Sequence, residues 1–237
     1  AMRQNTQSLI AGENTGVPIL ALVVTYVASS LSFPWLVARA HGVDLRRVGS
    51  RKLGGSNLAK SVGFLPGLVG GTLDGVKGFA AVLVTGALGM SLEAQLACGI
   101  AAIAGQMWPV LHRFDGGRAN ATGWGFALAA DPVAALIMGV PIYFGLIVRP
   151  FVRPRPTRLL PLASLLSFGI FPAVIWEQEG LTPTVVAGLA VLALIVVRRI
   201  SAGLREDLAT GASAARVLVN RALYDRSELQ ERGLVGI

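Results

Sequence analysis

The residues best suited to chemistry lie in two short, basic, glycine-rich stretches. The first, "LRRVGSRKLGGSNLAKSVG" at residues 45–63, combines glycines and serines with five Arg or Lys residues and contains no Asp or Glu. The second, "GQMWPVLHRFDGGRANAT" at residues 105–122, places two glycines directly before Arg118. Consecutive backbone N–H groups in glycine turns form concavities that bind anions, and Ser, Lys and Arg side chains add donors and positive charge. The two stretches therefore predict a phosphate site, although such turns also occur as plain loops at a membrane edge.

The remainder of the chain has the composition of a membrane protein. Of its 237 residues, 53% are hydrophobic and 14% are charged, and the mean hydropathy is +0.63, whereas soluble domains carry about 25% charged residues. The net charge of +8 does not indicate nucleic acid binding, because only 7% of the residues are aromatic and no basic helix offers bases a stacking surface. A single cysteine, Cys98, and two distant histidines, His41 and His112, predict no disulfide framework, no metal site and no cofactor.

Apolar runs separated by short polar loops predict an all-α, multi-pass membrane protein with about seven transmembrane helices. A helix needs about 20 residues to cross the apolar part of a bilayer. The fourth run is shorter than this, and Asp131-Pro132 separates it from the fifth. It is therefore either a half-helix buried among its neighbours or a full span with a polar end. The seven runs cover residues 17–37, 64–89, 95–111, 119–130, 132–148, 159–176 and 183–197.

The distribution of charge supports seven crossings and sets their direction. If the N-terminus is outside, 19 of the 21 Lys and Arg residues fall on the cytoplasmic side, with Arg3 outside and Lys77 inside a span. This asymmetry follows the positive-inside rule. Omitting the fourth run as a crossing would place the basic stretch 149–158 outside, against that rule. We therefore expect a protein of the cell inner membrane or plasma membrane with a cytoplasmic C-terminus.

Three regions follow from this pattern. Residues 1–16 form an N-terminal extension, residues 17–200 a seven-helix membrane domain, and residues 201–237 a cytoplasmic amphipathic helical tail. The tail has apolar residues at helical spacing, which are Leu208, Ala212, Ala215, Val219 and Ala222. Such a helix is expected to lie on the membrane surface or to bind a membrane protein partner.

Both glycine-rich stretches resemble motifs of the bacterial acyl-phosphate-dependent glycerol-3-phosphate acyltransferases (the PlsY family). "VGSRKLGGSNLAKSVG" resembles the motif G-S-G-N-x-G-A-T-N-x-x-R, and "LDGVKG" at residues 73–78 resembles the L-D-x-x-K-G that follows it. "GQMWPVLHRFDGGRANAT" is similar to the second motif, G-H-x-F-P-V-x-x-x-F-K-G-G-K-G-x-A-T. Because order, spacing and predicted topology agree over about residues 20 to 200, the chain is identified as a divergent member of this family.

The resemblance implies an enzyme of phospholipid synthesis that moves a fatty acyl group from acyl phosphate to the 1-hydroxyl of glycerol 3-phosphate, giving lysophosphatidate. Its partners would be these two substrates and membrane lipids, without nucleic acid, metal or cofactor. By motif position, the catalytic residues would be Ser50, Asn57, Lys60 and Arg118. The substrate-binding residues would be Gly49, Ser50, Gly54, Gly55, Ser56, Asn57, Lys60, Gly116, Gly117 and Arg118. For Ser50 and Asn57, helix capping is the alternative role.

Three further residues are expected to support the site: Asp74, Lys77 and Gln106. Asp74 and Lys77 lie three residues apart on one predicted helix, so that they face each other. An ion pair within a membrane is costly and points either to function or to a structural clamp, and we expect the clamp. Gln106 stands where the second motif has histidine; it can still form hydrogen bonds but cannot be protonated.

Other positions also depart from the motifs. Arg51-Lys52 replaces Gly-Asn, and Asp115 replaces a lysine and is expected to pair with Arg113 or Arg118. The family's third motif, H-R-x-N-I-x-R, is reduced to three arginines, which are Arg198, Arg199 and Arg205. These losses leave a second hypothesis open, a catalytically silent member that acts as a structural or regulatory membrane subunit. A solute transporter ranks behind both, because the sequence has no inverted repeat, and acyl-CoA or acyl carrier protein remain alternative donors.

Overall fold

The computed structural model describes residues 16–148, 151 and 158–228, and all regular structure among them is helical. The predicted all-α fold is confirmed, since each of the seven apolar runs contains helix. Most of the N-terminal extension, most of the basic stretch 149–158 and residues 229–237 of the tail lie outside the described residues. The α-helices are α2 (Gly16–Ser29), α3 (Phe33–Ala40), α4 (Gly55–Ser61), α5 (Phe64–Ala87), α6 (Leu92–Met107), α7 (Asn120–Ala130), α8 (Pro132–Met138), α9 (Val140–Val148), α10 (Leu159–Glu179), α11 (Pro183–Ser201), α12 (Leu204–Leu208) and α13 (Ala214–Tyr224).

Five helical stretches in the described part of the chain are long and apolar enough to cross a membrane. They are Pro18–Ala40, Phe64–Ala87, Leu92–His112, Leu159–Glu179 and Pro183–Ser201. The other two predicted spans are less regular. The helix α7 has 11 residues, and the fifth run is divided into α8 and α9 at Gly139.

Polar residues and prolines set the helix boundaries. The side chains of Ser91, Asp131 and Thr182 accept hydrogen bonds from the backbone N–H three residues later, at the starts of α6, α8 and α11. Ser32 does the same for α3, with Pro34 in the first turn. This cap divides the first predicted run, 17–37, between α2 and α3.

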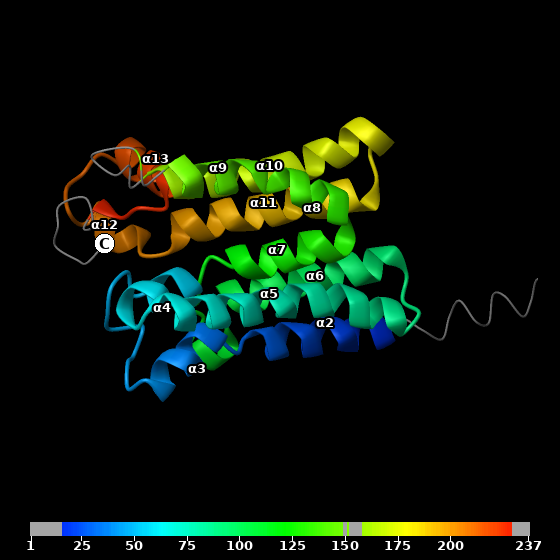
Figure 1. Ribbon diagram of the computed structural model, residues 1–237, viewed down its shortest axis with the longest axis horizontal. Coiled ribbons are helices and arrows are strands. Elements are labelled where there is room, and N and C mark those ends of the chain that lie inside the picture. The colour runs from blue at the N-terminus through cyan, green and yellow to red at the C-terminus, as the bar shows by residue number, and fades with distance from the viewer. Residues whose placement is uncertain (1–15, 149–150, 152–157, 229–237) are drawn as a thin grey trace, which may run out of the picture.

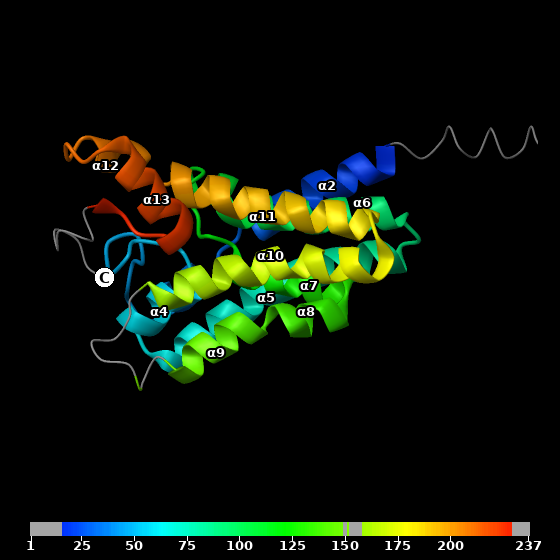
Figure 2. The same cartoon turned by 90° about the horizontal axis from the view of Figure 1, so that it is seen from above.

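The long helices run side by side along the length of the molecule (Figures 1 and 2). Helices α3, α4, α12 and α13 gather at one end, together with the connection from α6 to α7. The connections from α5 to α6 and from α10 to α11 lie at the opposite end. This arrangement places both glycine-rich stretches and the tail at one end, as the charge distribution predicts.

The short helix α7 lies inside the bundle. Its Phe126 is 1% exposed and packs in the main apolar cluster with Phe171. Two glycine contacts bring α5 and α7 close together, because a Cβ at Gly78 would overlap the carbonyl oxygen of Thr122, and one at Gly125 would overlap that of Gly75. The fourth run is therefore a short helix buried among its neighbours, which is the first of the two alternatives.

Candidate active site

One cavity joins the two glycine-rich stretches. It has a volume of about 1090 Å³ and is lined by α4, α5, α7, α9 and the loops beside them. Of the 13 predicted site residues, ten line this cavity: Ser50, Gly54, Gly55, Ser56, Asn57, Lys60, Asp74, Gln106, Gly117 and Arg118. Gly49, Gly116 and Lys77 do not line it.

The cavity has two chemically different parts. Its polar part carries the cationic side chains of Lys52, Lys60, Arg118, Arg199 and Arg226. The rest lies between α5, α7, α8 and α9 and is mainly apolar, with Phe79, Leu128, Leu136, Ile142 and Leu146. A pocket of this shape suits an amphiphile with an anionic head and an apolar chain.

The side chain of Asn57 organises the first glycine-rich stretch. It is 2% exposed, and its Oδ1 accepts a hydrogen bond from the Ser50 backbone N–H at 3.0 Å. Its Nδ2 lies 3.1–3.2 Å from the carbonyl oxygens of Leu45, Val48 and Lys52. Capping, the alternative considered for Ser50 and Asn57, does not occur, because the N-cap of α4 is Gly54 and Asn57 lies inside the helix.

Backbone strain is concentrated in the two glycine-rich stretches. In the described part of the chain, the non-glycine residues with positive φ are Arg51, Arg113, Phe114, Ala119 and Asp225. The first four belong to the two glycine-rich stretches, and the family motifs have glycine at the positions of Arg51 and Ala119. A non-glycine residue in this conformation costs about 1–3 kcal/mol. At Arg51 and Ala119 the loops therefore keep the left-handed backbone conformation that glycine adopts most easily, although neither residue is glycine.

Asp74, Lys77 and Gln106 form one buried polar cluster. Asp74 lies 2.8 Å from Lys77 Nζ and accepts a hydrogen bond from Gln106 Nε2 at 2.7 Å. Lys77 also donates to Gln106 Oε1 and to the carbonyl oxygens of Ser29 and Leu31, at 3.1 and 2.7 Å. The cluster therefore ties α5 and α6 to the break between α2 and α3.

A buried arginine holds the second glycine-rich stretch. Arg198, 5% exposed, donates to the carbonyl oxygens of Gly116 at 2.8 Å and Gly117 at 3.2 Å. It also pairs with Asp115 at 2.9 Å, so the predicted pairing of Asp115 with Arg113 or Arg118 is wrong. The sequence could not reveal this contact, because Arg198 is 83 residues away from Asp115. The two stretches touch directly, since a Cβ on Gly117 would lie 2.7 Å from the Leu53 carbonyl oxygen.

One acidic residue of the cavity, Asp225, was not predicted from the sequence. Its carboxylate lies 2.7 Å from Lys52 Nζ and 2.7 Å from Arg118 Nε. Burial disfavours the charge on Asp225, but the charges of Arg118 and Lys52 outweigh it and hold the pKa of this carboxyl well below its usual range. Burial also lowers the pKa of Lys52 to about 8, against the opposing effect of Asp225. The only sequence signal was an Asp directly after a helical pattern, where Asp tolerates positive φ.

The described part of the tail, residues 201–228, packs against the end of the bundle. Arg199, 1% exposed, donates from Nη1 to the carbonyl oxygens of Pro161, Ala222 and Leu223. The apolar face predicted to contact the membrane surface or a partner is mostly exposed, for example at Leu208 and Val219. The buried residues of α13 are Val217, Asn220 and Arg221. The third relic arginine, Arg205, is exposed on α12.

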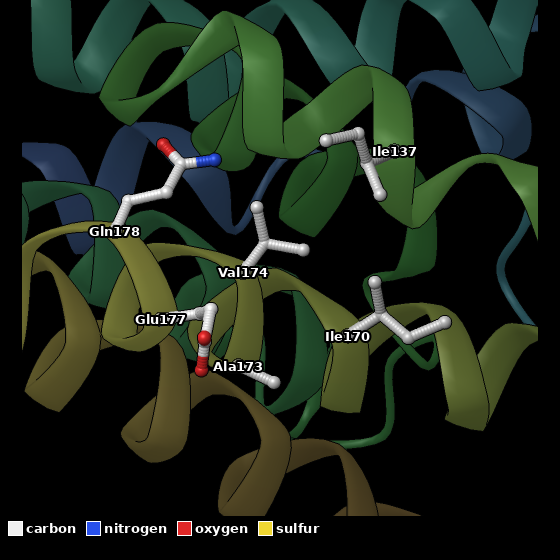
Figure 3. Close-up of a pocket in the computed structure, with 6 residues that line it drawn as sticks. All are labelled: Ile137, Ile170, Ala173, Val174, Glu177 and Gln178. Carbon is white, nitrogen blue, oxygen red and sulfur yellow. The ribbon is translucent and has the colours of Figure 1, made fainter.

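A second hollow, of about 450 Å³, lies between α8 and α10 near the opposite end of the molecule (Figures 1 and 3). Figure 3 shows Ile137 of α8 across from Ile170 and Val174 of α10, with Glu177 and Gln178 at the side. Its lining has one acidic and no basic residue. It therefore does not share the chemistry of the first cavity.

Comparison with known proteins agrees with these features. The sequence profile of a family described as "Glycerol-3-phosphate acyltransferase" matches residues 19–206. Glycerol-3-phosphate acyltransferase 5 of Dehalococcoides mccartyi is 36% identical over 211 residues, which cover 88% of each chain. Glycerol-3-phosphate acyltransferase 1 of Moorella thermoacetica is 30% identical over 187 residues, covering 77% of this chain and 89% of that protein.

Solved structures have the same fold. One is PlsY (YgiH), described as an integral membrane glycerol 3-phosphate acyltransferase in its glycerol 3-phosphate form. It has a TM-score of 0.69 and 25% identity, covering 85% of this chain and 98% of that chain. The lysophosphatidic acid form of PlsY has a TM-score of 0.66 and 24% identity. The match to the family profile ends at residue 206, before α13 and Asp225.

Proposed function

This chain belongs to the glycerol-3-phosphate acyltransferase family, and from that premise we propose that it moves a fatty acyl group from acyl phosphate to the 1-hydroxyl of glycerol 3-phosphate. It is an integral, multi-pass membrane protein like PlsY. The observation that carries the proposal is that one cavity is lined both by a group of cationic side chains and by many apolar ones. The cationic part would take the phosphate groups, and the apolar part would take the acyl chain.

In the proposed reaction, the acceptor hydroxyl oxygen bonds to the acyl carbonyl carbon, and the bond from that carbon to the phosphate oxygen breaks. The hydroxyl proton passes to phosphate, and the products are lysophosphatidate and inorganic phosphate. Because the donor is already activated, the chain needs no nucleophile of its own. Holding the two substrates side by side supplies proximity, and cationic donors stabilise the charge on the leaving phosphate.

The residue roles follow from their places in the cavity. We assign Ser50, Lys60 and Arg118 to the acceptor phosphate, since all three line the cationic part. Asn57 acts through the loop: its amide holds the Ser50 backbone and three carbonyl groups, so it is a positioning residue. The cluster of Asp74, Lys77 and Gln106 is assigned the role of a clamp, because its contacts go mainly to backbone and to one another.

The direct test is turnover by the purified protein. Glycerol 3-phosphate supplied with acyl phosphate, acyl-CoA or acyl carrier protein should give lysophosphatidate with the first donor only. No product with any donor, from folded protein in lipid bilayers, would favour the silent-subunit hypothesis. Product with acyl-CoA or acyl carrier protein alone would retain the enzyme and overturn the proposed donor.

A substitution tests the assignment of Arg118. Removing a charged hydrogen bond to phosphate costs about 1.5–3 kcal/mol, or roughly ten- to a hundredfold in affinity. Arg118→Ala should therefore weaken glycerol 3-phosphate binding by this factor, measured by calorimetry in detergent. Arg47→Ala is the matched control, because Arg47 is an exposed cation of the first stretch that does not line the cavity. Equal losses in both variants would contradict a specific role for Arg118.

A further inference from the structure

The carboxylate of Asp225 lies among the cations proposed to bind substrate phosphate. One oxygen is 2.7 Å from Lys52 Nζ and the other is 2.7 Å from Arg118 Nε. Lys52 Nζ also donates to the backbone carbonyl of Asp225 at 3.2 Å. The Asp225 side chain is 16% exposed and that of Arg118 is 11% exposed. Two carboxylate oxygens in this position occupy donors that a phosphate oxygen pair would otherwise use.

The segment that carries Asp225 is attached to the rest of the fold through α13, where Arg221 pairs with Asp207 at 2.6 Å and donates to the Gly203 carbonyl oxygen at 2.7 Å. The side chain of Arg199 binds the last carbonyl groups of α13, and Asp225 follows directly as its C-cap with φ of 49°. Aspartate adopts this left-handed conformation more readily than most other non-glycine residues. Both views place α13 at the same end of the bundle as the first glycine-rich stretch (Figures 1 and 2).

We propose that Asp225 is a tethered competitor, which fills the phosphate site of the unloaded protein and must leave before an anionic substrate binds. The identity of that substrate rests on the proposed function; the competition itself does not. A role as general base fits less well, because the cations that hold this carboxylate ionised also make it a poor proton acceptor. A purely structural clasp is the rival, and it requires Asp225 to stay in place when anion binds.

The affinity for inorganic phosphate tests the competition. If Asp225 occupies the site about nine-tenths of the time, only a tenth of the molecules can bind, so removing its charge should lower the phosphate Kd about tenfold. We expect this for Asp225→Asn, measured by calorimetry on the full chain in detergent. Glu206→Gln is the matched control, since it removes the same charge from an exposed site on α12 that does not line the cavity. An unchanged or weaker affinity in Asp225→Asn would overturn the proposal.

Hydrogen exchange on the unsubstituted protein tests the displacement and does not depend on the folding of a variant. When phosphate displaces Asp225, α13 loses the two ion pairs that hold its end, and its amides should exchange faster. We expect saturating inorganic phosphate or glycerol 3-phosphate to accelerate exchange across residues 214–224. Slower or unchanged exchange would favour a structural clasp and contradict the proposal that phosphate displaces Asp225. The unsubstituted protein could make no lysophosphatidate and still show both the lower phosphate Kd in Asp225→Asn and the faster exchange with phosphate. In that case the proposed function would fail, and the competition between Asp225 and phosphate would still be supported.

Discussion

At the scale of single residues, the glycine-rich stretches show how a motif can keep its shape without its glycines. Arg51 takes a φ of 56° where the family motif has glycine. Its side chain is exposed. The strain at this residue therefore lies in the backbone, and no buried contact of the side chain offsets it.

Substitution of Arg51 measures this strain. Arg51→Gly should stabilise the protein by about 0.5–1 kcal/mol, because relief of a left-handed Cβ gains about 1–2 kcal/mol and the freer unfolded chain takes back about 0.4–1 kcal/mol. Thermal unfolding in detergent should show a midpoint about 1–4 °C higher. Arg51→Ala is the control, since it removes the charge and keeps the Cβ. A similar rise in the alanine variant would assign the effect to charge.

The lowered pKa of Lys52 makes a pH prediction. Burial brings this pKa to about 8, so Lys52 is charged below pH 8 and neutral above it. The charged groups that face it are Asp225, Arg118 and Arg199, and the lowered pKa of Asp225 keeps that carboxylate ionised across this range. Affinity for glycerol 3-phosphate, which remains a dianion, should therefore fall by up to about tenfold between pH 7 and pH 9 as one charged hydrogen bond is lost.

Calorimetry at a series of pH values checks this expectation. Lys52→Arg should remove the step, because the guanidinium stays charged throughout. A parent with constant affinity from pH 7 to 9, or a step that persists in the arginine variant, would contradict a role for the Lys52 charge.

At the scale of helices, substitutions in the buried cluster of Asp74, Lys77 and Gln106 on α5 and α6 can distinguish a structural role from a catalytic one. Lys77→Met leaves the Asp74 carboxylate buried without its partner, which should cost about 3–5 kcal/mol. Combining it with Asp74→Asn should cost less than the sum of the two single changes, because no unpaired charge remains. Thermal unfolding measures both. A catalytic role would instead lower kcat in a variant whose unfolding temperature is unchanged.

The helices that bury apolar faces could be predicted from the sequence, whereas the polar contacts between distant residues could not. Long apolar runs and glycine-rich basic loops are local patterns, and ten of the predicted site residues do line one cavity. Asp225 reaches Lys52 across 173 residues, and Arg198 reaches Asp115 across 83. A single charged residue is not part of a periodic sequence pattern, so the sequence alone does not indicate which distant residue it will contact.

Two breaks in the spans were also missed, though their signals were present. Ser32 and Pro34 together are typical of a helix start, and they begin α3 inside a run that hydropathy alone treats as continuous. Gly139 separates α8 from α9. Average hydropathy does not register either feature, because each is local and the flanking residues are apolar.

At the scale of the whole molecule, the two ends of the bundle should lie on opposite sides of the membrane. We expect cysteines placed at Arg47 and Glu206 to react with a membrane-impermeant maleimide from the cytoplasmic side, and one at Glu179 from the other. A Cys98→Ala background removes the chain's own thiol. Labelling of all three from one side would contradict the seven crossings and the positive-inside assignment.

The ion pairs of Asp225 also impose an order on biogenesis. Chains are made and inserted from the N-terminus, so Lys52 and Arg118 leave the ribosome 173 and 107 residues before the carboxylate that neutralises them. During that interval we expect the two cations to meet the anionic lipid headgroups of the cytoplasmic leaflet, which hold basic residues on that side. The same charges thus anchor the nascent chain first and face the cavity later, and α13 joins them only after every helix of the bundle has been made.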